Sequence, residues 1–154
     1  MKKRLSNSEV KELAQVLGET GISKKDIVES GIVQGVEVLF VNGSPSYFKA
    51  DGKWLPTLRR VYAGPQHIIT KSVTVDVGAI KFISNGADVM RPGITAFDEG
   101  IEKNDFLLVK EITHGKVLAI GKALASGTEL KSASKGKVIS NVHYVGDWLW
   151  NLQP

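Results

Sequence analysis

The sequence of 154 residues contains no cysteine, which excludes disulfide bonds, thiolate zinc sites and catalysis by a thiol nucleophile. It also lacks long apolar runs. The run at 106–109 is far shorter than the roughly 20 residues that a membrane span needs. Residues 1–4 are followed by polar residues instead of the apolar core of a secretion signal. We therefore expect a cytoplasmic protein that does not cross a membrane.

The sequence motifs of several common enzyme classes are missing as well. The three histidines, His67, His114 and His143, are far apart and carry no zinc-hydrolase spacing. No dinucleotide-binding glycine pattern or glycine-Lys-Ser/Thr phosphate loop occurs. The adjacent acids Asp98 and Glu99 lie in an acid-rich loop, a pattern typical of a solvated surface. The sequence therefore predicts no metal site, no cofactor and no enzyme activity.

Positive charge is in modest excess, with a formal net charge of +4 and a pI near 9.3. This charge fits a polyanionic partner, although many proteins of this size are equally basic. Residues 1–70 hold 10 Lys and Arg against 7 Asp and Glu, whereas 71–154 hold 10 against 9. Five lysines between 116 and 137 are opposed only by Glu129, so they form either a basic face or a scattered solvated surface.

The first half of the chain has the pattern of a small α+β domain. Ser6 begins a capping pattern before apolar residues at helical spacing, which predicts a helix that ends at Gly18. We also expect a helical turn from Ser23 through Val28 to Gly31. Strands are predicted at 36–41 and 47–49, and a helix beginning at Pro56 within 54–61.

The second half has short apolar segments separated by glycine turns, which is typical of a closed β structure. The predicted elements are strands at 73–75 and 87–90, a helical turn at 78–84, and a hairpin of 106–112 and 116–121 around the turn 113–115. Strands at 138–140 and 142–144 are expected to return to the first strand and close the barrel. We therefore predict an α+β fold with an N-terminal domain at 1–67 and a β pseudo-barrel at 68–154.

Two segments carry a family resemblance. Residues 76–79, followed six residues later by 86–94, resemble the signature of the PUA domain, the module shared by pseudouridine synthases and archaeosine transglycosylases. Residues 121–123, 136–138 and 147–148 also fit, so the resemblance covers about 70–150.

The flanking residues narrow this resemblance. Lys81-Phe82-Ile83, Met90, 141–144 and 147–150 look like the malignant T-cell-amplified sequence family of translation proteins, which places a small domain before its PUA domain. Residues 37–40 and 47–59 resemble that preceding domain. The chain looks like an archaeal-type relative of this family.

The resemblance implies a non-catalytic protein that binds structured RNA, either tRNA or ribosomal RNA, in translation initiation, re-initiation or recycling. Its implied partners are the small ribosomal subunit and an initiation-factor-like protein. Two alternatives remain: a protein-interaction adaptor that uses the barrel surface, and an accessory RNA-binding subunit of an RNA-modification enzyme.

The resemblance also implies that RNA lies in a groove along residues 78–92. The residues expected to bind RNA there are Lys81, Gly86, Ala87, Arg91, Pro92 and His143. Gly86 equally fits a turn with positive φ. His143 and Tyr144 are neighbours on a strand and must face opposite sides, so at most one of them faces the groove, and we expect Tyr144 in the core. Asp76 is expected to cap the following helical turn.

Overall fold

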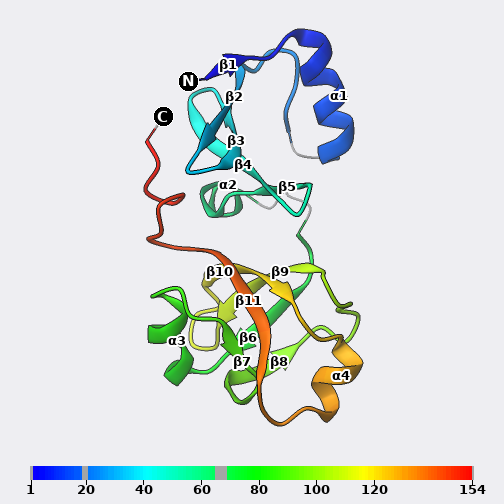
Figure 1. The fold of residues 1–154 in the computed structure, drawn as a ribbon, viewed down its shortest axis with the longest axis vertical. Helices are drawn as coiled ribbons and strands as arrows, with labels where there is room; N and C mark the ends of the chain where they lie inside the picture. The colour runs from blue at the N-terminus through cyan, green and yellow to red at the C-terminus, as the bar shows by residue number, and fades with distance from the viewer. Residues whose placement is uncertain (1, 19–20, 65–68, 154) are drawn as a thin grey trace. The chain divides into compact units, whose positions relative to one another are not determined.

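The computed structural model describes residues 2–18, 21–64 and 69–153, which divide into two units (Figure 1). The first unit contains the described residues up to 64 together with 148–153, and the second contains 69–147. The domain boundary predicted between 67 and 68 lies outside the described residues. The C-terminal segment 148–153, which the sequence prediction assigned to the second domain, belongs to the first unit.

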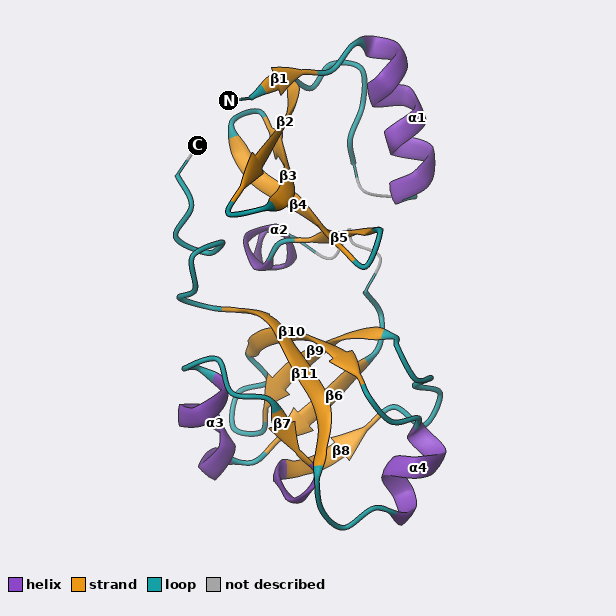
Figure 2. Ribbon diagram, in the orientation of Figure 1, coloured by secondary structure: helices purple, strands orange, loops and turns teal. Residues whose placement is uncertain are grey.

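The first unit is built on an antiparallel sheet. Its five strands follow the order β1-β2-β3-β4-β5 and span Lys3–Arg4, Val28–Val33, Val36–Val41, Ser44–Ala50 and Lys53–Pro56. Two helices complete the unit, α1 at Asn7–Leu17 and α2 at Leu58–Ala63 (Figure 2).

The predicted N-terminal helix is confirmed as α1. Ser6 and Glu9 form a reciprocal capping box: the Glu9 amide donates to Ser6 Oγ at 3.1 Å and the Ser6 amide donates to Glu9 Oε1 at 3.0 Å. Val10 and Leu17, on one face of the helix, are buried in a core that includes Leu39 of the sheet. The capping pattern and the helical spacing together define this element.

Two predictions in the first unit are wrong in detail. The expected helical turn stops at Asp26, because residues from Val28 onward pair with β3 as strand β2. The helix expected to begin at Pro56 begins at Leu58 instead, since Pro56 ends β5 and the Thr57 side chain caps the helix.

The second unit is a nearly closed six-stranded pseudo-barrel. Its strand order is β7-β11-β10-β9-β6-β8, formed by Val89–Met90, Lys137–Tyr144, Val117–Ala123, Phe106–Glu111, Ser72–Val75 and Ile94–Phe97. Only the short 3-10 helix η1, at Arg91–Gly93, separates the two edge strands β7 and β8 in sequence. Because so short a link joins opposite edges, the sheet must curl almost onto itself. The predicted order of an α+β domain followed by a β pseudo-barrel is confirmed.

The last strand pairs differently from the prediction. β11 pairs with β10 and β7, whereas β6 pairs with β8 and runs parallel to β9. Helices α3, at Val77–Ile83, and α4, at Gly127–Ser132, complete the unit. The barrel core includes Val73, Leu107, Val109 and Ile139, all at most 1% exposed. Among the described residues, no helix is long and apolar enough to cross a membrane.

The predicted central hairpin is confirmed as β9 and β10, and its turn is organised by a carboxylate. Glu111 is buried and accepts hydrogen bonds from the amides of Thr113, His114 and Lys116 at 2.9, 2.7 and 3.0 Å. These bonds, above all the one from Lys116, lower the pKa of the Glu111 carboxyl below its usual value. The folded turn therefore stabilises the ionised form of Glu111.

The acid-rich loop is exposed at Asp98, Glu99 and Glu102, as predicted for a solvated surface, and its acids also make specific contacts. Asp105 Oδ2 lies 2.7 Å from Lys71 Nζ and accepts the Glu102 amide at 2.8 Å. Glu99 Oε1 lies 2.8 Å from Lys131 Nζ on α4. These acids connect neighbouring loops of the barrel.

Candidate nucleic-acid interface

A groove of about 620 Å³ opens on the second unit between α3, β7 and η1. It coincides with the segment 78–92 in which the sequence placed an RNA groove. Its lining residues are Asp76, Gly78, Ala79, Phe82, Ile83, Ala87, Asp88, Val89, Met90, Pro92, Gly93 and Lys137.

The groove is held open by the cap of α3. Asp76 Oδ1 accepts the amide of Ala79 at 3.0 Å, which confirms the predicted capping role. The Asp76 amide donates to the Gly93 carbonyl at 2.9 Å. A Cβ at position 93 would lie only 3.4 Å from the Ala79 Cβ, so the two walls meet here with little room to spare. These contacts fix the spacing between α3 and η1.

The walls are mainly apolar and unusually exposed. Phe82 of α3 is 65% exposed and Met90 of β7 is 50% exposed. Large apolar side chains with this exposure, gathered in one groove, are typical of a binding surface. Phe82 offers a flat ring on which an unpaired base can stack.

One ion pair lies at this groove. Lys137 Nζ, on β11, lies 3.3 Å from Asp88 Oδ2, and both side chains are partly exposed. The other oxygen of Asp88 accepts the Asn141 amide at 2.7 Å. Asp88 is therefore anchored by the backbone, whereas the exposed ammonium of Lys137 can turn toward a phosphate.

The predicted RNA-binding residues fall into different environments. Ala87 and Pro92 are exposed and line the groove. Lys81 is exposed on α3, directly before Phe82, but is not one of the lining residues. It supplies positive charge on the same helix without shaping the cavity.

Gly86 is explained by packing. Its φ is +94°, and a Cβ there would lie 3.1 Å from Cε1 of Tyr144. The close neighbour that requires a glycine is therefore the Tyr144 ring. Gly86 does not line the groove, so its predicted contact with RNA gains no support from this geometry.

Arg91 does not line the groove either. Its Nε donates to the Leu130 carbonyl at 2.8 Å, and Nη1 donates to the Ile94 carbonyl at 3.3 Å. Its guanidinium also lies 5.5 Å from the ring centroid of Phe97. We had expected this side chain to bind a phosphate, but in the structure its donors connect η1 to α4 and β8.

His143 is buried although the sequence placed it at the RNA groove, whereas Tyr144 packs against the barrel core as expected. His143 is 1% exposed, and its Nδ1 lies 2.8 Å from Asp147 Oδ2, which also accepts the Tyr144 amide at 2.9 Å. Tyr144 is only half-buried. Neighbouring residues of a strand face opposite sides, and the Tyr144 ring lies on the side of Gly86 and the barrel core. A buried histidine cannot stack on a base, and this part of the prediction is corrected.

Sequence reasoning missed four residues of the groove region: Phe82, Met90, Lys137 and Asn141. Phe82 was detectable because it follows Gly78 by four residues and so lies on the same helix face. Lys137 and Asn141 come from β11, far along the chain, and only the strand pairing brings them here. Asn141 Nδ2 donates to the carbonyls of Ile83 and Ala87, at 3.2 and 3.0 Å, and connects the two ends of the turn.

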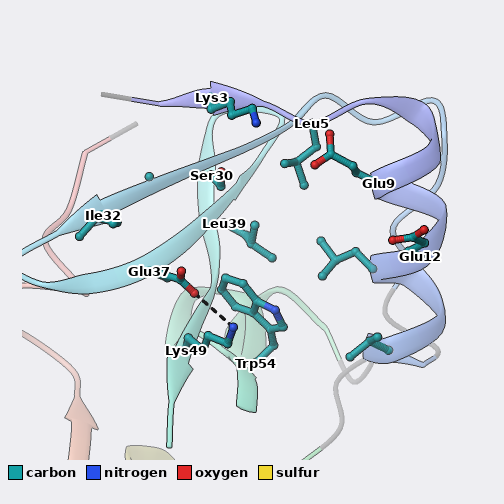
Figure 3. A pocket seen from close by; sticks show the side chains of 13 residues that line it. Lys3, Leu5, Glu9, Glu12, Ser30, Ile32, Glu37, Leu39, Lys49 and Trp54 are labelled. Atoms are coloured by element: carbon teal, nitrogen blue, oxygen red, sulfur yellow. Dashed lines mark ion pairs between the residues drawn. The ribbon is translucent and has the colours of Figure 1, made fainter. Parts of the chain in front are cut away.

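A second groove, of about 660 Å³, lies in the first unit between α1 and the sheet (Figure 3). Leu39 and Trp54 contribute apolar surface from the sheet, while Glu9 and Glu12 project from α1 (Figure 3). Hydrogen bonds from Ser6, the backbone amide first and then the hydroxyl, lower the pKa of the Glu9 carboxyl. Its charged lining consists of three carboxylates and two lysines, Lys3 and Lys49, and Lys49 Nζ lies 3.3 Å from Glu37 Oε2.

Within the described part of the chain, no three His, Asp or Glu side chains gather where they could hold a metal ion. The groove of the second unit is lined by apolar surface, backbone and the charged side chains of Asp76, Asp88 and Lys137.

Comparisons with known proteins agree with the geometry. A family model described as "PUA domain" matches residues 71–145. An uncharacterized protein of Methanocaldococcus jannaschii is 43% identical over 133 residues, which cover 86% of this chain and 80% of that relative. Translation machinery-associated protein 20 of Saccharomyces cerevisiae is 34% identical over 123 residues, 76% of this chain and 67% of that relative. The crystal structure of a hypothetical protein from Pyrococcus horikoshii matches with a TM-score of 0.80 and 35% identity over the whole of both chains. None of these three names states a catalysed reaction.

Proposed function

Because the chain belongs to the PUA-domain family that includes translation machinery-associated protein 20 and malignant T-cell-amplified sequence 1, we propose that it binds structured RNA. The RNA is tRNA or small-subunit ribosomal RNA, engaged in the cytoplasm during initiation, re-initiation or recycling. The protein acts without catalysis, on the small ribosomal subunit and with an initiation-factor-like partner. The observation that carries the proposal is the exposed apolar groove around Phe82.

The groove suits an unpaired nucleotide better than a duplex. An unpaired base stacks on the Phe82 ring and contacts Met90, while the backbone of the RNA passes Lys137 and Lys81. Each phosphate that a lysine neutralises adds roughly 0.7 to the negative slope of log affinity against log salt for a single strand. RNA binding here is therefore expected to weaken steeply with salt.

The first unit supports a second candidate function, protein interaction. Val16 and Ile32, both on its groove, are 71% and 68% exposed. Glu37 on the same groove is paired with Lys49, whereas the carboxylates of Glu9 and Glu12 suit an apolar protein segment that carries basic residues. An adaptor role of this kind would be only weakly sensitive to salt, because apolar contacts dominate it.

The test is an RNA titration with two matched variants of α3. Phe82 and Val77 are 65% and 64% exposed on the same helix, but only Phe82 lines the groove. We expect Phe82→Ala to weaken binding to tRNA or to a small-subunit RNA fragment by at least fivefold, because stacking contributes about 1–3 kcal/mol per base. Val77→Ala should leave binding within twofold of wild type.

Salt dependence separates the two functions. Wild-type affinity measured at two salt concentrations should fall with added salt, and Phe82→Ala should reduce affinity at both. Absence of RNA binding contradicts the RNA-binding proposal and favours the adaptor, whereas equal effects of the two variants contradict binding in the groove around Phe82.

A further inference from the structure

A cluster of cationic and aromatic side chains lies on the first unit and shares no residue with the groove of that unit. The C-terminal segment lies against α2, where Arg59 Nε donates to the Trp150 carbonyl at 2.8 Å. The guanidinium carbon of Arg59 lies 4.8 Å from the Trp150 ring centroid. Tyr62, one turn along α2, meets the same ring edge-on, with centroids 5.8 Å apart and planes at 77°.

These contacts hold Arg59 in place without occupying all of its donors. Its Nε and one face are used by Trp150, and no described residue accepts a hydrogen bond from its two terminal nitrogens. The side chain as a whole is exposed. A guanidinium fixed on one side and open on the other presents a planar fork that matches phosphate oxygens.

Tyr62 adds an exposed ring to this fork. It is 50% exposed even though Trp150 fixes its orientation. The neighbouring Arg60 differs, because it is half-buried with its guanidinium 5.4 Å from the buried Tyr47 ring. Helix α2 contains no acidic residue that would repel an anion. The fixed guanidinium of Arg59 beside the exposed ring of Tyr62 is a combination that binds a nucleotide by its phosphate and its base.

We propose that Arg59 and Tyr62, positioned by Trp150, form a second RNA contact that takes one unpaired nucleotide. The base stacks on Tyr62 and a phosphate accepts hydrogen bonds from the terminal nitrogens of Arg59. This inference rests on the proposed RNA-binding function and adds a contact on the first unit. An acidic peptide would satisfy the guanidinium but offers no base to the exposed Tyr62 ring, so the cluster favours RNA.

The experiment measures the affinity of the full chain for a tRNA transcript and for a single-stranded oligouridylate. Tyr62→Ala should weaken binding roughly tenfold, about 1.4 kcal/mol. Tyr62→Phe keeps the ring and should remain within twofold of wild type. Arg59→Lys keeps the charge but loses the planar fork, and we expect a loss of about threefold. Lys53→Ala, an exposed cation on the same unit, serves as the matched control and should have little effect.

Two readouts separate failure of this contact from failure of the proposed function or of folding. The tryptophan fluorescence of each variant must match that of the wild type, because loss of the packing around Trp150 would change it. If Tyr62→Ala disturbs the C-terminal segment, Tyr62→Phe is the variant that tests the contact. With 4-thiouridine in the RNA, ultraviolet crosslinks should appear on a peptide from α2 or the C-terminal segment as well as on the second unit.

Weaker binding of Tyr62→Ala together with those crosslinks supports the second contact. If Phe82→Ala weakens binding while Tyr62→Ala and Tyr62→Phe bind equally well, the second contact is overturned and the RNA-binding proposal stands. If wild-type protein binds neither RNA, both proposals are overturned. Binding of an acidic peptide in preference to both RNAs also overturns the second contact.

Discussion

Replacing Gly86 by alanine tests whether Tyr144 closes the turn beside the groove. Gly136 provides the matched control, because its φ is +93° against +94° at Gly86, while nothing lies within 4 Å of its added Cβ. A left-handed backbone costs an alanine about 1–2 kcal/mol at either position. Only at Gly86 does the new methyl group meet a ring, at 3.1 Å from Tyr144 Cε1.

The ring contact should make the Gly86 variant the less stable of the two. Overpacking of this kind costs about 1–3 kcal/mol when the neighbour must move by a few tenths of an ångström. We therefore expect Gly136→Ala to lose about 1–2 kcal/mol and Gly86→Ala to lose about 2–5 kcal/mol.

Urea titration gives these free energies for the second unit when it is followed by NMR signals of its core methyl groups, such as those of Leu107 and Val109. The three tryptophans belong to the first unit and do not report on this transition. Equal losses in the two variants would show that the Tyr144 ring moves aside freely. The packing explanation of Gly86 would then be wrong.

Three further predictions concern the second unit. Glu111→Gln should weaken the dependence of stability on pH, as measured by acid titrations followed by circular dichroism. Because folding lowers the pKa of the Glu111 carboxyl, its contribution to the free energy of unfolding is present above the unfolded pKa, which is about 4.3, and is lost as pH falls through the folded pKa. Arg91→Ala should lower the free energy of unfolding by about 1–3 kcal/mol, because two hydrogen bonds to backbone carbonyls are lost. The same variant should reduce RNA affinity less than Phe82→Ala does. A larger loss of RNA affinity would show that Arg91 contacts the RNA. Gly127→Ala should cost about 3 kcal/mol in urea unfolding, since its Cβ would lie 2.7 Å from the backbone carbonyl carbon of Glu99, whereas Gly100→Ala, with open space around it, should be nearly neutral.

Local signals in the sequence were sufficient for most elements of the fold. The cap at Ser6, the cap at Asp76 and the turn between β9 and β10 each depend on residues within a few positions of one another, and each was predicted. The strand at Val28–Val33 was missed because its six residues alternate poorly, and pairing with β3 decides its conformation.

The candidate site was predicted less completely, for two physical reasons. The segment 78–92 was found because glycine and helix signals are local, but the roles of Arg91 and His143 depend on distant partners. Leu130 supplies the carbonyl that holds Arg91, and the inward side of β11 is set by its register with β10. Neither partner can be read from a single sequence without the pairing of strands.

The most direct test of the account is to map the RNA surface of the second unit by NMR. Amide signals of isotopically labelled protein would be followed during titration with the small-subunit RNA fragment. The account predicts that the largest changes fall on α3, β7 and η1, around Phe82 and Met90, with small changes in the loop 98–105, which contacts the opposite end of β6. Changes that are absent from the groove, or concentrated on that loop, would contradict the claim that this groove binds RNA.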